Sequence, residues 1–251
     1  MALKRIMPCL LYDGKGLVKT VKFKNPSYVG DPINAIKIFN EKEVDELVLI
    51  DINATKEKRK INISKIADFA GECFMPFAYG GGVKTVNEFY ELFKNGVEKV
   101  VVNSLIFENP SVIKEAVSKY GSQAVVACVD FKKNMFGKKN VYSFAGHSVK
   151  YSAIDFVKYL EEDLGVGELF LQNVDAEGTW DGFDNEFTKQ ITDLTTLPVI
   201  ACGGAGNINH LKEVLYTSGA NAAAIGSMAV YSKKGMGVLI NFPKRSDVII
   251  E

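Results

Sequence analysis

A short apolar run that ends in glycines occurs twice in this sequence. The first copy reads Met-Pro-Phe-Ala-Tyr-Gly-Gly-Gly at residues 75–82, and the second reads Leu-Pro-Val-Ile-Ala-Cys-Gly-Gly-Ala-Gly at residues 197–206. A stretch compatible with a helix follows Thr85 in one case and Asn207 in the other. Glycine lets backbone N–H groups approach a ligand, and the start of a helix favours an anion. The pair predicts two phosphate-binding turns, although each turn alone also fits a tight connection without a ligand.

Apolar runs alternate with amphipathic stretches along the whole chain. The eight runs cover residues 4–11, 47–51, 77–79, 100–103, 124–130, 169–173, 199–202 and 222–226. This alternation predicts repeated βα units that close into a parallel barrel. Residues 100–104 also correspond to residues 223–227, so the second half of the chain repeats the first. We therefore expect a single (β/α)8 TIM-barrel domain over residues 1–251, with a two-fold half-barrel repeat.

The composition indicates an ordinary globular protein that acts on a small molecule. The chain has 251 residues, 47% of them hydrophobic, and its thirty basic residues balance thirty acidic ones. This balance does not favour nucleic acid or an anionic membrane as a partner. No segment is long enough to span a bilayer, and the N-terminus lacks a signal-peptide cleavage pattern. We expect a cytoplasmic protein.

Cysteine and histidine usage argues against a metal site. Cys9, Cys73, Cys128 and Cys202 lie far apart, and three of them fall inside apolar runs, as buried small hydrophobic residues do. The two histidines are too few for a His-rich metal site and do not favour a Ser-His-Asp triad. We expect no metal and no cofactor, and chemistry that depends on carboxylates, amides, lysines and backbone groups.

Two long connections are candidates for segments beside the site. Residues 12–30 contain three glycines and Lys15, Lys19, Lys22 and Lys24, which predicts a lid whose lysines reach a phosphate, or alternatively a solvated basic hairpin. Residues 132–148 are polar and predict a small hairpin. The glycine-rich sequence after Tyr231 is poor for a last helix.

Polar residues at the ends of the runs are the candidates for chemistry, because TIM barrels carry their active sites at the carboxyl ends of the strands. These candidates are Asp51, Asn103, Ser104, Asp130, Asp175, Glu177 and Ser227. Asp130 ends a hydrophobic run, where burial would raise the pKa of its carboxyl toward values useful in acid–base catalysis. A loop-capping role is the alternative for Asp130. The acidic turn at residues 175–179 could orient a polyol or simply form the turn.

Charged residues begin four strands at the opposite end of the predicted barrel. They are Arg5, Glu46, Lys99 and Glu168. Any one of them alone could simply be a solvent-exposed charged residue beside a strand. Two positive and two negative groups on four strands could instead close a ring of ion pairs across the barrel bottom, which would act as a gate or plug.

Several segments together resemble HisF, the cyclase subunit of imidazole glycerol phosphate synthase. They are Pro-Cys-Leu at 8–10, Gly-Asp-Pro at 30–32, Asp-Glu-Leu at 45–47, Glu-Lys-Arg-Lys at 57–60, Gly-Ser-Gln-Ala-Val-Val at 121–126, Asp-Ala-Glu-Gly-Thr at 175–179 and Leu-Thr-Thr-Leu-Pro at 194–198. The resemblance runs in order from residue 1 to about residue 227.

This resemblance implies a subunit that takes ammonia from a HisH-like glutaminase docked at the barrel bottom. The four strand-start charges, Arg5, Glu46, Lys99 and Glu168, match the family's ammonia gate. Its bisphosphate-ligand contacts are matched by Lys19, Gly81, Gly82, Asn103, Ser104, Gly203, Gly204 and Ser227, and we add Asp51, Asp175, Glu177 and Gly178 to this expected ligand-binding set. In the family, ammonia attacks a ribulosyl aminoimidazole carboxamide nucleotide at the barrel top.

The sequence departs from the family at one of its two catalytic aspartates. Asp130 matches the second, but Leu11 stands at the first, and leucine cannot transfer a proton. Nearby, Glu177 replaces Asp, Gln172 replaces Thr and Cys202 replaces Ser. We expect a HisF-like paralogue that supplies ammonia to a sugar amidotransferase in surface-polysaccharide biosynthesis. The alternatives are the histidine-pathway cyclase, with Tyr12 or Asp13 as the acid, and a noncatalytic scaffold or activator of the glutaminase.

Overall fold

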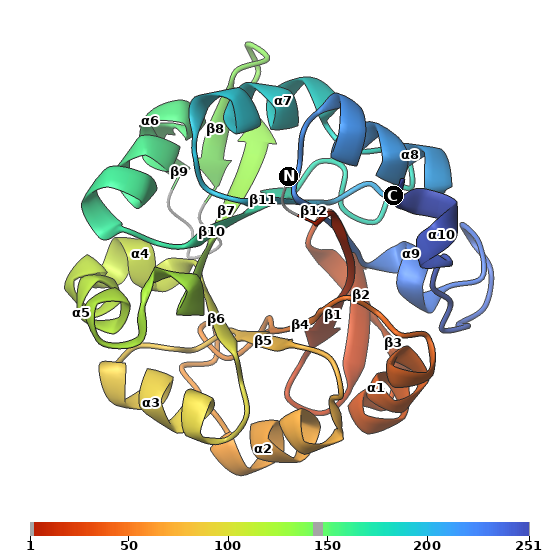
Figure 1. The fold of residues 1–251 in the computed structure, drawn as a ribbon, viewed down its shortest axis with the longest axis horizontal. Helices are drawn as coiled ribbons and strands as arrows, with labels where there is room; N and C mark the ends of the chain where they lie inside the picture. The colour runs from red at the N-terminus through yellow and green to blue at the C-terminus, as the bar shows by residue number, and fades with distance from the viewer. Residues whose placement is uncertain (1–2, 143–147, 251) are drawn as a thin grey trace.

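A computed structural model describes residues 3–142 and 148–250, and within them eight parallel strands form a closed barrel surrounded by helices (Figure 1). In barrel order the strands are β1 (Arg5–Tyr12), β4 (Leu47–Asp51), β5 (Phe77–Gly80), β6 (Lys99–Val102), β7 (Val125–Lys133), β10 (Glu168–Asn173), β11 (Val199–Cys202) and β12 (Ala222–Ile225). Strand β12 pairs in parallel with β1, and β7 pairs with β10, which closes the ring. The TIM-barrel prediction is confirmed.

Helices follow the strands, and six of those described begin at a residue whose side chain caps the first turn. They are α1 (Pro32–Glu41), α2 (Ile63–Glu72), α3 (Val86–Lys94), α4 (Ser104–Glu108), α5 (Pro110–Tyr120), α6 (Ala153–Lys158), α7 (Asn185–Leu194), α8 (Ile208–Lys212), α9 (Ser227–Val230) and α10 (Arg245–Val248). A 3-10 turn (Ser122–Ala124) follows α5, and π-helical turns (Tyr159–Leu164 and Glu213–Thr217) extend α6 and α8. Asp31 caps α1 before a proline, and Thr85 forms a capping box with Glu88 at α3.

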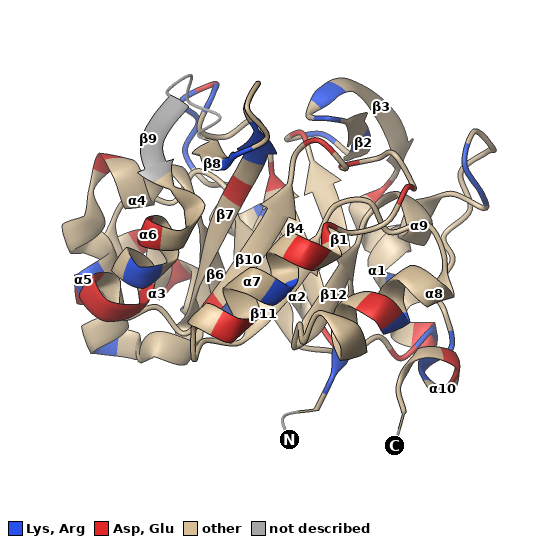
Figure 2. Ribbon diagram, turned by 90° about the horizontal axis from the view of Figure 1, so that it is seen from above, with Lys and Arg blue, Asp and Glu red and all other residues tan. Residues whose placement is uncertain are grey.

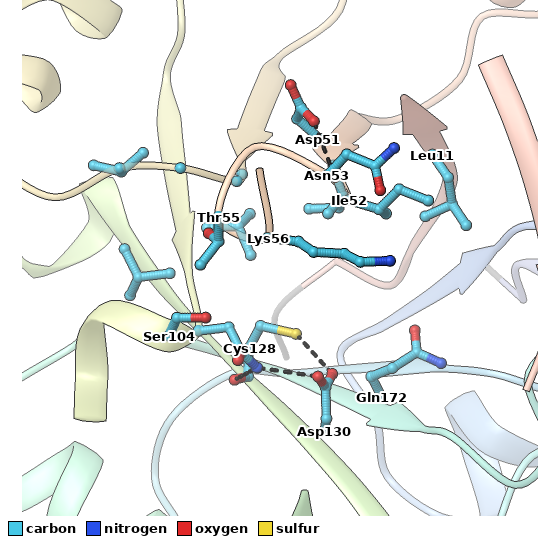
Figure 3. Close-up of a pocket in the computed structure, with 18 of the residues that line it drawn as sticks. Leu11, Asp51, Ile52, Asn53, Thr55, Lys56, Ser104, Cys128, Asp130 and Gln172 are labelled. Carbon is cyan, nitrogen blue, oxygen red and sulfur yellow. Dashed lines mark hydrogen bonds between the residues drawn. The ribbon is translucent and has the colours of Figure 1, made fainter. Parts of the chain in front are cut away.

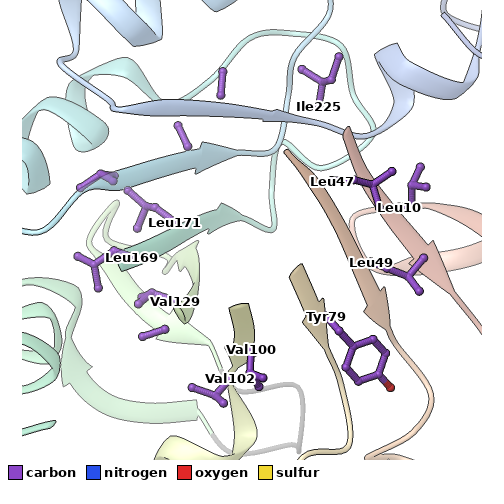
Figure 4. Close-up of a cluster of buried hydrophobic side chains, with 14 of the residues drawn as sticks. Leu10, Leu47, Leu49, Tyr79, Val100, Val102, Val129, Leu169, Leu171 and Ile225 are labelled. Carbon is purple, nitrogen blue, oxygen red and sulfur yellow. The ribbon is translucent and has the colours of Figure 1, made fainter. Parts of the chain in front are cut away.

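The strands alternate between two apolar layers. On β1, Ile6 and Leu10 face outward into the large core under the helices, whereas Met7 and Cys9 belong to a smaller cluster inside the barrel. Figure 4 shows part of the outer layer, including Leu47 and Leu49 on β4 and Tyr79 on the neighbouring β5. Because side chains alternate along a strand, the inward-facing residues at its two ends point toward the two mouths of the barrel, where a site can form.

The two half-barrels repeat one another at their glycine turns. Gly81 and Gly203 have φ values of +109° and +98°, which L side chains rarely adopt. A Cβ at Gly81 would collide with the carbonyl oxygen of Asp51 on β4, and a Cβ at Gly203 would collide with that of Asn173 on β10. Glycine is thus required by the packing of each turn on the preceding strand, independently of any ligand.

Each half-barrel also inserts an antiparallel hairpin after its first strand. After β1 come β2 (Leu17–Val21) and β3 (Lys24–Gly30), and after β7 come β8 (Lys139–Tyr142) and β9 (Ser148–Ser152). The second hairpin agrees with the prediction for residues 132–148, although residues 143–147 lie outside the described part. Figure 2 shows both hairpins at one end of the barrel and both termini at the other.

The C-terminal segment matches the expectation of a weak last helix. Helix α9 ends at Val230, and only the four-residue α10 follows it. None of the helices described in residues 3–142 and 148–250 is long and apolar enough to cross a membrane.

Candidate functional site

Two pockets open at the carboxyl ends of the barrel strands. The first has a volume of about 240 Å³ and contains Leu11, Asp51, Gly81, Gly82, Asn103, Ser104, Asp130 and Gln172 in its wall. The second, of about 40 Å³, is lined by Leu11, Lys19, Gln172, Glu177, Gly178, Cys202, Gly203, Gly204 and Ser227, among others. The structure thus gathers the predicted barrel-top residues into two adjoining pockets, one under each glycine turn.

Asp130 is a buried acid whose carboxylate accepts two side-chain hydrogen bonds. The inward alternation on β7 places Asp130 beyond Cys128, and the carboxyl is only 6% exposed. The Nδ2 of Asn103 donates a hydrogen bond to it at 3.2 Å, and the Cys128 thiol donates another at 3.5 Å. Burial raises the pKa of Asp130 to about 7, against the lowering effect of these two hydrogen bonds. The carboxyl can therefore both accept and release a proton near neutral pH, as the sequence predicted.

Leu11 contributes an apolar side chain to the walls of both pockets. It is half-buried at the end of β1 and lines both pockets, and Figure 3 shows it on a different wall of the first pocket from Asp130. Its side chain is hydrocarbon, so it cannot exchange a proton with a ligand. The other carboxylate in the wall of this pocket, Asp51, is bound by Arg59, and Leu11 adds no acid–base group.

Asp51 is bound by an arginine that sequence reasoning assigned no role. The Nη1 and Nη2 atoms of Arg59 donate to the two carboxylate oxygens of Asp51 at 3.2 and 2.9 Å. The backbone N–H groups of Asn53 and Ala54 donate to the same carboxylate. Asp51 lies in the wall of the first pocket, yet its oxygens hold the loop after β4 in place.

Lys19 is the one lysine of the first hairpin that lies inside the site. Lys15, Lys22 and Lys24 are exposed, whereas Lys19 is 6% exposed and lines the second pocket. Its Nζ lies 3.2 Å from the carboxylate of Glu177, so the positive charge is compensated by that buried acid.

Glu177 also fastens the first hairpin over the second pocket. Its carboxylate accepts hydrogen bonds from the Thr20 hydroxyl at 2.9 Å and from the backbone N–H of Phe23 at 3.1 Å, and its backbone oxygen accepts one from Lys22. Gly178 beside it has a φ of +75°, and a Cβ there would come within 2.6 Å of the Thr20 carbonyl oxygen. The acidic turn after β10 therefore positions a lid.

Asp175 serves the fold at the rim rather than the pockets. Its carboxylate accepts a hydrogen bond from the backbone N–H of Lys133, at the end of β7. It is absent from the described linings of both pockets. Of the predicted ligand-binding residues, Asp175 is the one that the structure does not bring to a pocket.

Two thiols meet at the floor of the second pocket. Cys9 and Cys202 come from β1 and β11, and both are buried and free of disulfides. A hydrogen bond with Cys202 lowers the pKa of Cys9, burial acts in the opposite direction, and the nearby charge of Lys19 lowers it further. The same hydrogen bond and burial raise the pKa of Cys202. Within the described residues, no group of three or more metal-ligating side chains is assembled.

A closed ring of four ion pairs lies at the opposite end of the barrel. Arg5 pairs with Glu46 at 2.6 Å and also with Glu168. Lys99 pairs with the same two carboxylates, at 3.0 and 2.9 Å. Each acid is thus held between both cations, and the acids are almost fully buried while the cations are about one-fifth exposed. The ion pairs considered from the sequence are present.

Sequence reasoning missed four residues of the barrel top: Thr20, Phe23, Lys56 and Arg59. Thr20 and Phe23 line the first pocket through the first hairpin, and Lys56 and Arg59 come from the loop after β4. Arg59 belongs to one of the motifs quoted above, which was the only available signal. No pattern in the sequence marks Lys56, because a single lysine in a polar loop is normally solvated.

Comparison with known proteins is consistent with this architecture. Residues 5–235 match the family described as "Histidine biosynthesis protein". A Pseudomonas aeruginosa protein with the provisional name imidazole glycerol phosphate synthase subunit hisF2 is 47% identical over 244 residues, covering 97% of both chains. A Vibrio vulnificus protein with the provisional name subunit hisF3 is 40% identical, over 98% of this chain and 95% of its own.

A Clostridium botulinum protein named imidazole glycerol phosphate synthase subunit HisF is 37% identical over 247 residues, covering 98% of this chain and 97% of its own. These similarities extend over almost the full length of each relative. The chain therefore belongs to the family of HisF-like imidazole glycerol phosphate synthase subunits.

Proposed function

We propose that this protein is the ammonia-receiving subunit of a glutamine amidotransferase complex, paired with a HisH-like glutaminase at the barrel bottom. The observation that carries the proposal is the closed ring of Arg5, Glu46, Lys99 and Glu168. A charge-balanced ring across the entrance of a barrel costs desolvation and is weak evidence for stability alone, so a functional role is the better account of it. The ring acts as the gate through which ammonia enters.

The interior above the ring suits a small neutral molecule. Inner positions of the strands carry Val48, Ala78, Val101, Ala222 and Ala224, which offer hydrocarbon walls and small side chains. The inner face of β7 then leads through Cys128 to Asp130 in the first pocket. Ammonia released below the ring would thus arrive beside the group whose pKa is near 7.

At the barrel top the protein binds a phosphorylated small molecule. The two glycine turns each have a serine near them at a matching repeat position, Ser104 in the first pocket and Ser227 in the second. Backbone N–H groups at glycines and serine hydroxyls are suitable donors for phosphate oxygens. Lys19 adds an amine donor to the wall of the second pocket, where it is paired with Glu177.

The acceptor of the ammonia is a separate sugar amidotransferase in polysaccharide biosynthesis, and this chain is a paralogue of the histidine enzyme. Leu11 removes one of the two acids that the histidine cyclase needs. The relatives with the provisional names hisF2 and hisF3 are more similar to this chain than the Clostridium botulinum HisF protein is.

The main alternative, a histidine-pathway cyclase with a displaced acid, receives little support from the site. The Tyr12 hydroxyl donates to the carbonyl oxygen of Gly14, and the ring packs against Phe69 under the helices. Asp13 accepts hydrogen bonds from the backbone N–H groups of Lys15 and Gly16. Both side chains hold the loop after β1, and neither belongs to the described pocket linings.

Co-expression with a HisH-like glutaminase from the same organism tests the proposal. We expect a stable complex whose glutamine hydrolysis exceeds that of the glutaminase alone. A matched pair of variants locates the contact: Lys99→Met in the ring should weaken the stimulation, whereas Lys119→Met on the outer surface should not. Failure of the two proteins to associate would overturn the ammonia-supply function. Stimulation without any binding of phosphorylated ligands would favour the noncatalytic activator instead.

A further inference from the structure

Lys56 extends an amine across the mouth of the first pocket. It lies in the loop between β4 and α2, and Figure 3 shows its side chain reaching over the cavity toward the side of Leu11. Within the described residues, its Nζ forms no hydrogen bond or ion pair with another side chain, while the nearby Arg59 is fully engaged by Asp51 and Glu57. Lys56 is exposed to solvent, so the mouth of the pocket presents a hydrated cation that is not paired with an acid in the described part of the protein.

The acids of the pocket do not supply the missing partner. Asp51 and Asp130 are the only carboxylates in its described lining. Both oxygens of Asp51 accept from Arg59. Asp130 interacts with Asn103 and Cys128, and its pKa of about 7 leaves it close to half protonated at neutral pH. The charge available to a ligand on the Leu11 side of the pocket is therefore positive.

A ligand that enters the pocket removes water from the Lys56 ammonium group, which costs free energy unless the ligand brings a negative charge. The wall on this side of the pocket includes Leu11 and Ile52, whose hydrocarbon side chains offer no acceptor to an ammonium group, and the amide of Asn53 carries no charge. A ligand that fills the pocket displaces water from Lys56, and an unpaired desolvated charge is strongly unfavourable. An anionic group on the ligand at this point offsets that cost and adds a charge-assisted hydrogen bond.

We propose that Lys56 is a specificity-determining residue that binds an anionic group, carboxylate or phosphate, of a ligand whose phosphate lies at the first glycine turn. The inference rests on the proposed phosphate binding by Gly81, Gly82 and Ser104. It goes further in fixing the substrate class: the ligand carries a second negative charge in the first pocket, next to Leu11. Where the family resemblance places a proton-transferring acid, this site presents a cation for recognition.

Two open-chain probes isolate the second charge. 6-Phosphogluconate carries a phosphate and a carboxylate at opposite ends, and sorbitol 6-phosphate is matched to it except that a hydroxymethyl group replaces the carboxylate. Calorimetric titration of the full-length protein should show 6-phosphogluconate binding about tenfold more tightly, as expected for one charge-assisted contact. Equal affinities, or no binding of either probe, would overturn the proposal.

Three variants attribute this preference to Lys56. Lys56→Met should bring the ratio of the two affinities close to one while leaving sorbitol 6-phosphate binding unchanged, and Lys56→Arg should retain the preference. Lys58→Met is the control, since Lys58 lies two residues away, exposed and outside both described pocket linings. A preference that survives in Lys56→Met would refute the assignment. Stimulation of the glutaminase, measured on the same variants, tests the proposed pairing separately because it depends on the opposite end of the barrel.

Discussion

The two ends of this barrel are built on the same strands but differ in how they handle charge. At the bottom, Arg5 and Lys99 are balanced by two buried glutamates, and every charge has two partners. At the top, the side chains that hydrogen-bond to Asp130, Asn103 and Cys128, are uncharged, and Leu11 has no charge to pair with it. Arg5 and Leu11 are six residues apart on β1, or roughly 20 Å along an extended strand.

This separation explains how one end can change while the other stays the same. At about 20 Å, two unit charges interact by only about 0.8 kcal/mol at an effective dielectric constant of about 20, so charges at the two ends interact weakly. A substitution at Leu11 therefore leaves the ring intact. The ion-pair ring at the bottom is therefore complete, while the top carries Leu11 and an isolated Asp130.

The largest stability effect should come from the isolated acid at the top. The folded-state pKa of Asp130, about 7, lies above the roughly 3.9 of an unfolded chain. Between these values the folded protein holds a proton that the unfolded chain has released, so the stability from this group is greatest below pH 4 and is lost as pH rises through 7. In Asp130→Asn the amide does not titrate, so the variant does not lose stability through this group as pH rises.

The free energy of unfolding of Asp130→Asn, relative to wild type, should therefore rise by up to about 4 kcal/mol between pH 4 and pH 8. Urea unfolding at several pH values measures this difference. Asp68→Asn, an exposed change on α2, is the control and should give a much flatter difference. A flat profile for Asp130→Asn would mean that Asp130 is not buried as an isolated acid.

A smaller effect is expected from the balanced ring at the bottom. Glu46→Gln leaves Arg5 and Lys99 to share one carboxylate, which should cost about 2–3 kcal/mol, less than the roughly 3–5 kcal/mol of a fully buried pair because both cations are partly exposed. Chemical unfolding provides the measurement, with the exposed Glu41→Gln as reference. Adding Lys99→Met should recover part of the loss. If the double variant is no more stable than Glu46→Gln, the ring is not a coupled unit.

The smallest effect concerns the lid at the top. Thr20→Val removes one hydrogen bond to Glu177 and leaves those from Lys19 and Phe23, so the local opening of β2 and β3 should become easier by about 1 kcal/mol. Hydrogen exchange of residues 17–30 detects this, while global unfolding in urea should change little. Unchanged exchange in the hairpin would show that Glu177 does not fasten it.

The barrel and its bottom ring could be predicted because each depends on local pattern. Eight apolar runs and repeated glycine turns specify the parallel barrel. Charges that begin strands meet at one end of a closed barrel regardless of loop details. For the same reason the burial of Asp130 followed from the hydrophobic run before it.

Loop contacts at the top could not be predicted in the same way. Arg59 reaches Asp51 across an irregular turn, and only the turn geometry decides that contact. Among the lysines of the first hairpin, Lys19 lies within β2 and is buried against Glu177 from the turn after β10, whereas Lys15 precedes the strand and is exposed. The sequence does not reveal a contact between residues so far apart in the chain. The contact of Asp175 with the backbone N–H of Lys133 was not predicted, because a strand-end acid can serve a neighbouring backbone as well as a ligand.

The measurement that tests the central comparison most directly is turnover of the histidine-pathway nucleotide with ammonium salt supplied in place of a glutaminase. This assay bypasses the bottom of the barrel and reports only on the top. We expect wild type to be at least about 100-fold slower than the roughly one turnover per second of an ordinary enzyme, and Leu11→Asp to recover part of the activity. Wild-type turnover on the order of one per second or faster would contradict the account and make the chain a histidine-pathway cyclase.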